Sequence, residues 1–185
     1  MPIRHADASR DAEACARIYS PYVLDTAISF EETPPSADEM ERRMQDLGAR
    51  FPWLVAEDDE EGTVAGYAHA AEHRARAAYR WSVDVTVYVE RGARGRGLGR
   101  ALYGALLPLL RAQGFRMACA GITLPNDASV ALHELFGFEL VGIHRAIGWK
   151  AGAWRDVGWW QLELGSLAGE PPPEPAPPMP DPLPG

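Results

Sequence analysis

The sequence predicts one α/β domain in which strands and helices alternate along the chain around a central sheet. Two patterns in residues 81–110 support this expectation. Valines at every second position from Val83 to Val89 predict a strand with one buried face. Apolar residues at helical spacing from Leu98 to Leu109 predict a helix, and a turn with four glycines separates the two. We therefore expect a strand, a glycine turn and a helix in this order.

Length and composition narrow the possible functions. A chain of 185 residues, 46% of them hydrophobic, is long enough for one domain with a real core. Its net charge of -8 argues against a nucleic-acid partner, because phosphate binding needs a basic face. Cys15 and Cys119 show no zinc or redox spacing, and no apolar leader or membrane-spanning run is present. We expect a cytoplasmic protein with no membrane partner.

Further features are expected inside residues 81–110, and further helices and strands before and after them. Asp84, Thr86 and Tyr88 should share the open face of the strand. Pro108 should kink the helix or end its regular part early. The other expected features are a strand at Ile3, a helix from Ser9, a helix from the capping box Ser36-x-x-Glu39 to Gly48, a hairpin of strands 53–56 and 64–69, a helix end at Gly114, a strand at 117–122, a helix from the cap Asn126 to Gly137, and closing strands 138–147 and 154–164.

The C-terminal segment differs in composition from the rest. Between residues 165 and 185, nine of twenty-one residues are proline, and none is Lys or Arg. Such a segment buries too little apolar surface to fold. We expect a folded domain over residues 1–164 and a disordered or polyproline tail over 165–185.

The glycine turn suits a phosphate, because the first amides of a helix are unpaired and lie at the positive end of its dipole. A Walker A loop would need Lys after Gly97, where Leu98 stands. A dinucleotide fingerprint would need a small residue where Leu102 stands. What remains is Arg94-x-x-Gly97-x-Gly99, which resembles the pyrophosphate-binding loop of GNAT acetyltransferases.

A later stretch strengthens this resemblance. Asn126-x-x-Ser129-x-x-Leu132-His133-Glu134-x-x-Gly137-Phe138 is similar to the second half of the GNAT pattern. More narrowly, Tyr79-x-Trp81, Thr86-Val87-Tyr88-Val89 and Trp154-x-Asp156-Val157-Gly158 resemble phosphinothricin and methionine sulfoximine N-acetyltransferases. The resemblance implies a mixed, mostly antiparallel sheet with splayed strands flanked by helices.

The resemblance also implies an activity. It is the acetyl-CoA-dependent acetylation of the α-amine of a small amino-acid analogue, by direct attack of the amine on the thioester. A homodimer is common in this family. The alternatives are a GNAT enzyme for another small amine, a polyamine or a protein N-terminus, and a non-catalytic module that binds acyl-CoA.

Particular residues are assigned by the same resemblance. Acetyl-CoA would be bound by Val87, Tyr88, Val89, Arg94, Gly95, Arg96, Gly97, Leu98, Gly99, Arg100 and Asn126. The amine pocket would be lined by Tyr79, Asp84, Val85 and Thr86. Phe30, Arg74 and Arg76 are further candidates for this pocket, chosen from their residue types and positions in the sequence. Either Arg74 or Arg76 could pair with an anionic group of the substrate, or both could be solvated.

Two residues are candidates for the proton transfers. Asp84 lies where the family usually has Glu, and it is our candidate base, directly or through a water; the alternative is a hydrogen-bonded strand residue. His133 lies where many GNAT enzymes have the Tyr that protonates the thiolate, and it is either the acid or structural. The run from His133 to Gly137 lacks the second His of a zinc helix, so no metal cofactor is expected.

Overall fold

The computed structural model describes residues 2–58, 62–169 and 172–179. Its core is a seven-stranded sheet in the order β1-β2-β3-β4-β5-β7-β6. Only β4 and β5 pair in parallel, so the sheet is mixed and mostly antiparallel, as the family resemblance implied. The strands are β1 (Ile3–His5), β2 (Trp53–Glu57), β3 (Val64–Glu72), β4 (Ser82–Val89), β5 (Met117–Leu124), β6 (Glu139–Lys150) and β7 (Ala153–Glu163).

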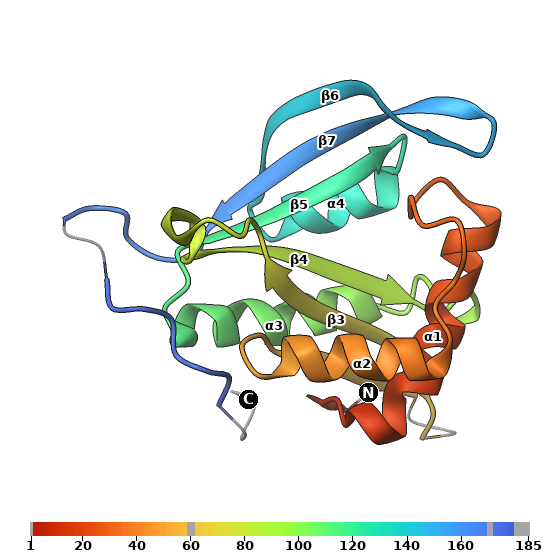
Figure 1. The fold of residues 1–185 in the computed structure, drawn as a ribbon, viewed down its shortest axis with the longest axis horizontal. Helices are drawn as coiled ribbons and strands as arrows, with labels where there is room; N and C mark the ends of the chain where they lie inside the picture. Colours follow the sequence, from red (N-terminus) through yellow and green to blue (C-terminus); the bar gives the residue numbers. More distant parts are fainter. Residues whose placement is uncertain (1, 59–61, 170–171, 180–185) are drawn as a thin grey trace.

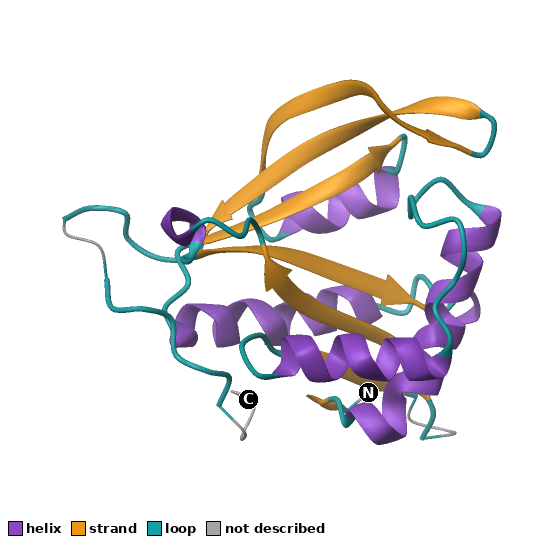
Figure 2. Ribbon diagram, viewed as in Figure 1, coloured by secondary structure: helices purple, strands orange, loops and turns teal. Residues whose placement is uncertain are grey.

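Helices cover both faces of this sheet (Figures 1 and 2). One apolar cluster joins α1 and α2 to β2 and β3, and another packs α3 against the opposite face. The helices are α1 (Ala8–Asp25), α2 (Ala37–Gly48), α3 (Leu98–Gln113) and α4 (Asp127–Leu135), with 3-10 turns η1 (Ala77–Tyr79) and η2 (Arg91–Ala93). Among the described residues, none of the helices is long and apolar enough to cross a membrane.

Strand β4 positions the functional face. Val83 and Val85 are buried against the α3 side, and the alternation leaves Asp84, Thr86 and Tyr88 on the other face, as the sequence predicts. The pairing between β4 and β5 covers only residues 82–84 and 117–119. Beyond Asp84 the two strands diverge, which is visible as the separation between β4 and β5 in Figure 1. This confirms the splayed strands.

Helix α3 begins at the glycine turn and ends at Gly114, as predicted. Gly97 precedes the helix with φ 83° and Gly114 follows it with φ 98°, both in the left-handed region that favours glycine. Of the two effects expected from Pro108, the early end is wrong, because α3 continues to Gln113. The kink stays a prediction. The leucines on both sides of Pro108, among them Leu107 and Leu109, are buried, and this packing holds the last turn despite one missing N–H donor.

The remaining expected elements are present. The Asn126 side chain accepts a hydrogen bond from the Ser129 N–H at 3.3 Å and caps α4. Strands β6 and β7 form a hairpin through Ala151 and Gly152. The expected turn between β2 and β3 lies partly at residues 59–61, outside the described residues.

The described part of the C-terminal segment lies against the domain. The Ala176 N–H donates to the Gln113 carbonyl and the Gln113 amide donates to the Ala176 carbonyl, both at 2.8 Å. The Trp81 indole N–H donates to the Pro173 carbonyl at 3.1 Å. Residues 173 and 176 therefore contact the domain. The disordered or polyproline character expected for the tail stays a prediction. The domain boundary at residue 164 stays a prediction.

Candidate active site

A cavity of about 380 Å³ lies between the end of β4, the glycine turn and the first turns of α3 and α4. Most of the predicted cofactor residues line it: Val87, Tyr88, Val89, Arg94, Gly95, Gly97, Gly99, Arg100 and Asn126. Leu98 is buried in the core, so only its backbone can contribute. Arg96 instead forms an ion pair with Asp58 at 2.7 Å. Tyr22, which the sequence analysis did not single out, also lines the cavity.

The glycine turn that lines this cavity has backbone amides and a nearby arginine that can bind an anion. Gly95 and Gly97 have φ values of 77° and 83°, and a Cβ atom added at either position would meet nothing within 4 Å. The backbone is therefore open to a ligand at the amides that start α3. The Arg94 guanidinium carbon lies 5.0 Å from the centre of the Tyr22 ring, which holds this cation at the edge of the cavity. These features fit a diphosphate.

A narrow cavity of about 90 Å³ fills the wedge between β4 and β5. Residues 85–88 of β4 and 120–123 of β5 form its walls. It shares Val87, Tyr88 and Asn126 with the anion cavity. A long, thin ligand with its anionic end at the start of α3 can therefore extend its other end between the strands.

Asp84 lies at the apex of this wedge, in the last residue pair before β4 and β5 separate. The His73 Nδ1 atom lies 2.6 Å from the Asp84 Oδ1 atom, so the imidazole N–H donates to the carboxylate. Burial raises the pKa of Asp84 above its ordinary value, and the hydrogen bond from His73 opposes that rise. A carboxylate with a raised pKa is better matched to a general base at neutral pH.

The sequence analysis missed His73. Ala71 pairs with Asp84 and His69 pairs with Thr86 across β3 and β4. His73 continues this every-second-residue series, so its side chain lies on the same face. The alternation of residues 69, 71 and 73 was visible in the sequence, but the register that places it beside Asp84 was not.

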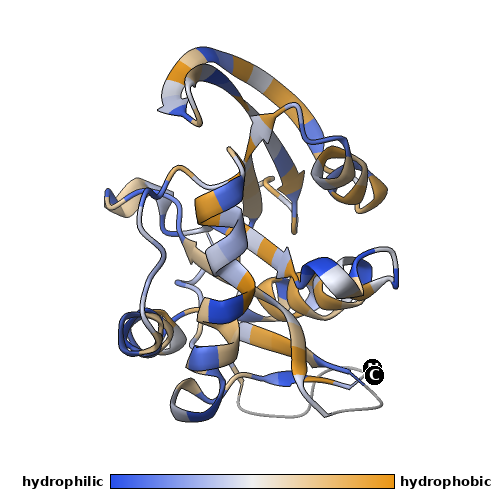
Figure 3. Ribbon diagram, turned by 90° about the vertical axis from the view of Figure 1, so that its right-hand side faces the viewer, coloured by the Kyte–Doolittle hydropathy of each residue, from blue (hydrophilic) through white to orange (hydrophobic). Residues whose placement is uncertain are grey.

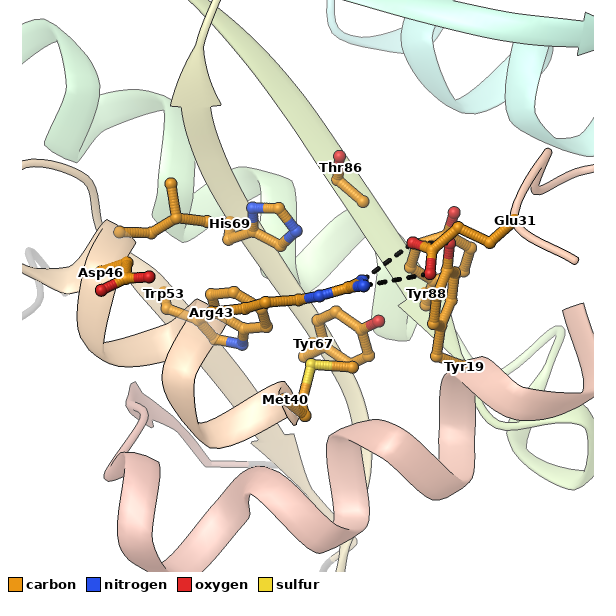
Figure 4. Close-up of a pocket in the computed structure, with 11 residues that line it drawn as sticks. Tyr19, Glu31, Met40, Arg43, Asp46, Trp53, Tyr67, His69, Thr86 and Tyr88 are labelled. Carbon is orange, nitrogen blue, oxygen red and sulfur yellow. Dashed lines mark hydrogen bonds and ion pairs between the residues drawn. The ribbon is translucent and has the colours of Figure 1, made fainter. Parts of the chain in front are cut away.

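A second cavity of about 460 Å³ opens on this face of β4, between the strands and α2 (Figure 4). Thr86 and Tyr88 from β4 and His69 from β3 form part of its wall. The Arg43 guanidinium spans the cavity and donates to both Glu31 carboxylate oxygens, at 2.8 and 3.1 Å. This face of β4 is thus open to a small polar molecule at Thr86 and Tyr88, whereas Asp84, on the same face, does not line the cavity.

Charges in this cavity are set by burial and pairing. Burial alone would raise the pKa of Glu31, but the hydrogen bonds from Arg43 and Tyr19 outweigh it and hold the pKa below its ordinary value. Burial lowers the pKa of His69 to about 4, so the imidazole is neutral at pH 7. The cavity wall therefore carries the Glu31–Arg43 pair, a neutral imidazole and the acidic side chain of Asp46.

The structure separates the two predicted arginines. Arg74 lies near Asp84, with its guanidinium carbon 5.9 Å from the centre of the Trp159 ring. Arg76 lines a different cavity, which the C-terminal residues 174–177 help to form. Tyr79 lies beside His73, with 5.7 Å between ring centres. Arg74 and Tyr79 are thus brought together with Asp84, whereas Arg76 is not.

The other predicted substrate residues differ in which of their atoms can reach a substrate. The Val85 side chain is buried in the core on the α3 side, so only its backbone can contact a substrate. Thr86 lines both the wedge and the second cavity. Phe30 is 40% exposed, and its ring lies against Gly148 of β6. Phe30 therefore lies where the loop after α1 meets the β6–β7 hairpin.

His133 is 3% exposed and both of its ring nitrogens have partners. Its Nδ1 atom lies 2.7 Å from the Ser129 carbonyl oxygen, which can only accept, so Nδ1 carries the proton. Nε2 then accepts from the Tyr103 hydroxyl at 2.9 Å. Burial lowers the pKa of His133. These hydrogen bonds support a structural role, but His133 also lines the wedge between β4 and β5, so the acid role stays a prediction.

Comparison with known proteins agrees with this geometry. A family model described as the acetyltransferase (GNAT) domain matches residues 3–159. The chain belongs to the GNAT acetyltransferases. It is 43% identical to a phosphinothricin N-acetyltransferase of Streptomyces viridochromogenes, over 97% of this chain and 94% of that protein. It is 37% identical to an L-methionine sulfoximine/L-methionine sulfone acetyltransferase of Salmonella typhimurium, over 89% of this chain and 95% of that protein.

A solved structure shows the same GNAT fold. A phosphinothricin acetyltransferase from Sinorhizobium meliloti, crystallised in complex with acetyl-CoA, superposes with a TM-score of 0.89. It is 40% identical and the match covers 95% of each chain. The fold and the N-acetyltransferase class inferred from the sequence motifs are therefore confirmed.

In this GNAT domain, replacing His133 by alanine is expected to lower the free energy of unfolding by about 2–4 kcal/mol. The change leaves a cavity and removes the partner of two buried polar groups. Urea denaturation measures the loss. The control is Glu13→Ala at an exposed position of α1, which should change stability by less than about 0.5 kcal/mol. Equal stability of the two variants would contradict the structural role of His133.

Proposed function

We propose that this GNAT enzyme transfers the acetyl group of acetyl-CoA to the α-amine of a small amino-acid analogue such as phosphinothricin or methionine sulfoximine. One observation carries the proposal. The Asp84 carboxylate lies at the apex of a wedge between β4 and β5 that leads to the anion cavity at α3. The names of the relatives support the substrate class.

Acetyl-CoA fits the residues around the two joined cavities. The amides of Gly97 and Gly99 at the start of α3, with Arg94 and Arg100 beside them, would hold the diphosphate. The backbone of residues 87–89, which has no partner strand in the register of β4 with β5, would hydrogen-bond the pantetheine arm. The acetyl thioester would then lie in the wedge.

The proposed chemistry needs an uncharged amine, an aligned thioester and donors for the developing oxyanion. Asp84 would accept the proton of the amine, directly or through a water, and its raised pKa improves this match. As the tetrahedral intermediate collapses, the C–S bond breaks and the coenzyme A thiolate leaves with that proton, passed back by Asp84 or through solvent. Backbone N–H groups of β4 beyond Asp84 would donate to the carbonyl oxygen. His73 would orient the carboxylate. Any acid role of His133 would first require Tyr103 to give up its hydrogen bond.

For the carboxylate or phosphinate of the substrate, Arg74 is the better placed of the two arginines. It is exposed, close enough to Asp84 to lower its pKa, and supported by the face of Trp159. Its planar guanidinium suits bidentate binding of such a group.

Replacing His73 by leucine is expected to raise the pKa of Asp84, because the hydrogen bond from His73 lowers it. The base acts only when ionised, so the acidic limb of kcat against pH should move to higher pH. Replacement by glutamine retains a donor and should shift the limb less. The pH profile of kcat at saturating amine measures both variants. An unmoved limb in the leucine variant would rule out His73 as a positioning residue for Asp84.

A panel of amines tests the substrate class. Thiol release from acetyl-CoA is measured with phosphinothricin, methionine sulfoximine and methionine sulfone, and in parallel with spermidine and a peptide that has a free N-terminus. We expect turnover with the amino-acid analogues. Turnover only with spermidine or the peptide would favour the other GNAT substrates. Acetyl-CoA binding without any turnover would favour a non-catalytic module.

We further propose that the enzyme is a cytoplasmic homodimer that pairs through the β6–β7 hairpin. This hairpin carries alternating hydrophobic and hydrophilic bands (Figure 3). Its large exposed side chains are Leu140, Val141, Ile143, Ile147, Trp149 and Trp154. Such a patch is typical of an interface. The unpaired Cys15 and Cys119 suit a reducing compartment.

Sedimentation velocity tests the dimer. The full chain should sediment as a dimer, and Trp154→Lys, which places a charge in the exposed patch, should sediment as a monomer. The exposed Leu24→Lys on α1 is the matched control and should remain dimeric. A monomeric wild-type chain would contradict the proposal.

A further inference from the structure

One cluster of metal-ligating side chains occurs among the described residues. It consists of His73, Asp84 and Cys119, whose ligand atoms all lie within 4.8 Å of one another. We propose that this cluster binds a Zn²⁺ ion. We also infer that the bound ion inhibits acetyl transfer by occupying the Asp84 carboxylate, a consequence that rests on the proposed function.

The sheet register brings the three residues together. Asp84 and Cys119 are paired in the parallel ladder of β4 and β5. His73 directly follows β3, whose Ala71 pairs with Asp84. Asp84 and Cys119 each lie near the start of their strand, and His73 lies just after the end of β3. Because these positions are 11 and 35 residues apart in sequence, no short spacing motif reveals them.

The donor set suits zinc. It offers an imidazole nitrogen, a carboxylate oxygen and a sulfur, which are the three ligand types of protein zinc sites. Mg²⁺ and Ca²⁺ favour oxygen ligands and are disfavoured here. The Cys119 S–H proton is released to solvent on binding, as zinc deprotonates a coordinating thiol. The charges of the ionised carboxylate and the thiolate then balance that of the ion.

The geometry requires only local adjustment. Tetrahedral zinc at ordinary bond lengths separates nitrogen, oxygen and sulfur ligands by about 3.3–3.6 Å. On binding, His73 changes to the tautomer with its proton on Nε2, which frees the Nδ1 lone pair for the ion. The present separation of 2.6 Å between His73 Nδ1 and Asp84 Oδ1 must then widen, and the sulfur must approach both atoms. The His73 and Asp84 side chains are 17% and 32% exposed, so an ion can enter from solvent and keep a water as its fourth ligand.

The protonation of the Cys119 thiol and the position of Arg74 both affect what this cluster can do. Burial raises the pKa of Cys119 to about 11, so the thiol is protonated at pH 7 and is a poor acyl-accepting nucleophile. Arg74 is the nearby cation that acts on both Asp84 and Cys119. It opposes a second cation, but it is exposed, and solvent and salt weaken that repulsion.

Cobalt titration of the full chain tests the site without acetyl-CoA or amine. Co²⁺ replaces Zn²⁺ in such sites and gives an absorption band when sulfur is a ligand. We expect this band in the wild-type protein at one ion per chain, and its loss on addition of Zn²⁺. Cys119→Ser should abolish the band. Cys15→Ser, at a fully buried cysteine in the α1 cluster, is the matched control and should retain it.

A wild-type chain without the sulfur band, or a band that survives in Cys119→Ser, would overturn the proposed zinc site.

Thiol-release assays test the second part of the proposal, the inhibition of acetyl transfer by the bound ion. Zn²⁺ should inhibit the wild-type enzyme and Cys15→Ser, and a chelator should restore activity. Loss of a direct ligand should weaken inhibition of Cys119→Ser by about tenfold or more. Equal inhibition of the wild type, Cys15→Ser and Cys119→Ser by Zn²⁺ would show that the ion does not inhibit by binding at this site. Absence of acetyl transfer in metal-free protein would instead refute the proposed function.

Discussion

Replacement of Asp84 by asparagine is expected to lower kcat by about 10²- to 10⁴-fold, the range for loss of a general base. Asparagine keeps the size of the side chain and the acceptor for His73, so the local structure should be retained. It cannot accept the proton of the amine. Steady-state thiol release with phosphinothricin or methionine sulfoximine measures the effect.

Two measurements separate catalysis from folding for this variant. Calorimetric affinity for acetyl-CoA should be unchanged, because Asp84 does not line the cavity at the start of α3. Asp38→Asn, at an exposed position in the first turn of α2, removes the same charge elsewhere and should retain the wild-type kcat. If Asp84→Asn turns over at the wild-type rate, Asp84 is not the base.

Replacement of Gly97 by valine is expected to raise the KM for acetyl-CoA by about 10- to 100-fold. A β-branched residue at φ 83° costs about 1–3 kcal/mol, and relieving the strain moves the amides that start α3. Initial rates at varied acetyl-CoA and saturating amine measure the change.

The matched control is Gly104→Val, which adds the same side chain to the same helix. Gly104 lies inside α3, and an added Cβ atom would meet nothing within 4 Å. Its KM for acetyl-CoA should stay near the wild-type value. An equal KM in the two variants would contradict the binding of the diphosphate at Gly97.

Features determined by local chemistry could be predicted from the sequence. The alternation that places Asp84 and Tyr88 on one face of β4 depends only on the pleat of a strand. The glycine at the start of α3 and the Asn126 cap of α4 depend on backbone geometry and one hydrogen bond. The mixed sheet with splayed strands followed only from the family resemblance, and the parallel pairing of β4 with β5 was not predicted.

Features determined by tertiary contacts could not be predicted in this way. His73 reaches Asp84 only through the register of β3 with β4. The ion pair of Arg96 with Asp58 joins residues 38 positions apart, and it holds this arginine outside the cofactor cavity. Pro108 remains inside α3 because of the packing around it. Each case depends on neighbours that a single sequence does not place.

A crystal structure of the protein with acetyl-CoA tests the central claim most directly, because it locates the thioester relative to Asp84. We expect the diphosphate on the amides of Gly97 and Gly99, and the thioester in the wedge between β4 and β5. The Asp84 carboxylate should then lie within about 6 Å of the acetyl group, the reach of one bridging water. A thioester outside the wedge, or a carboxylate directed away from it, would contradict the proposed mechanism.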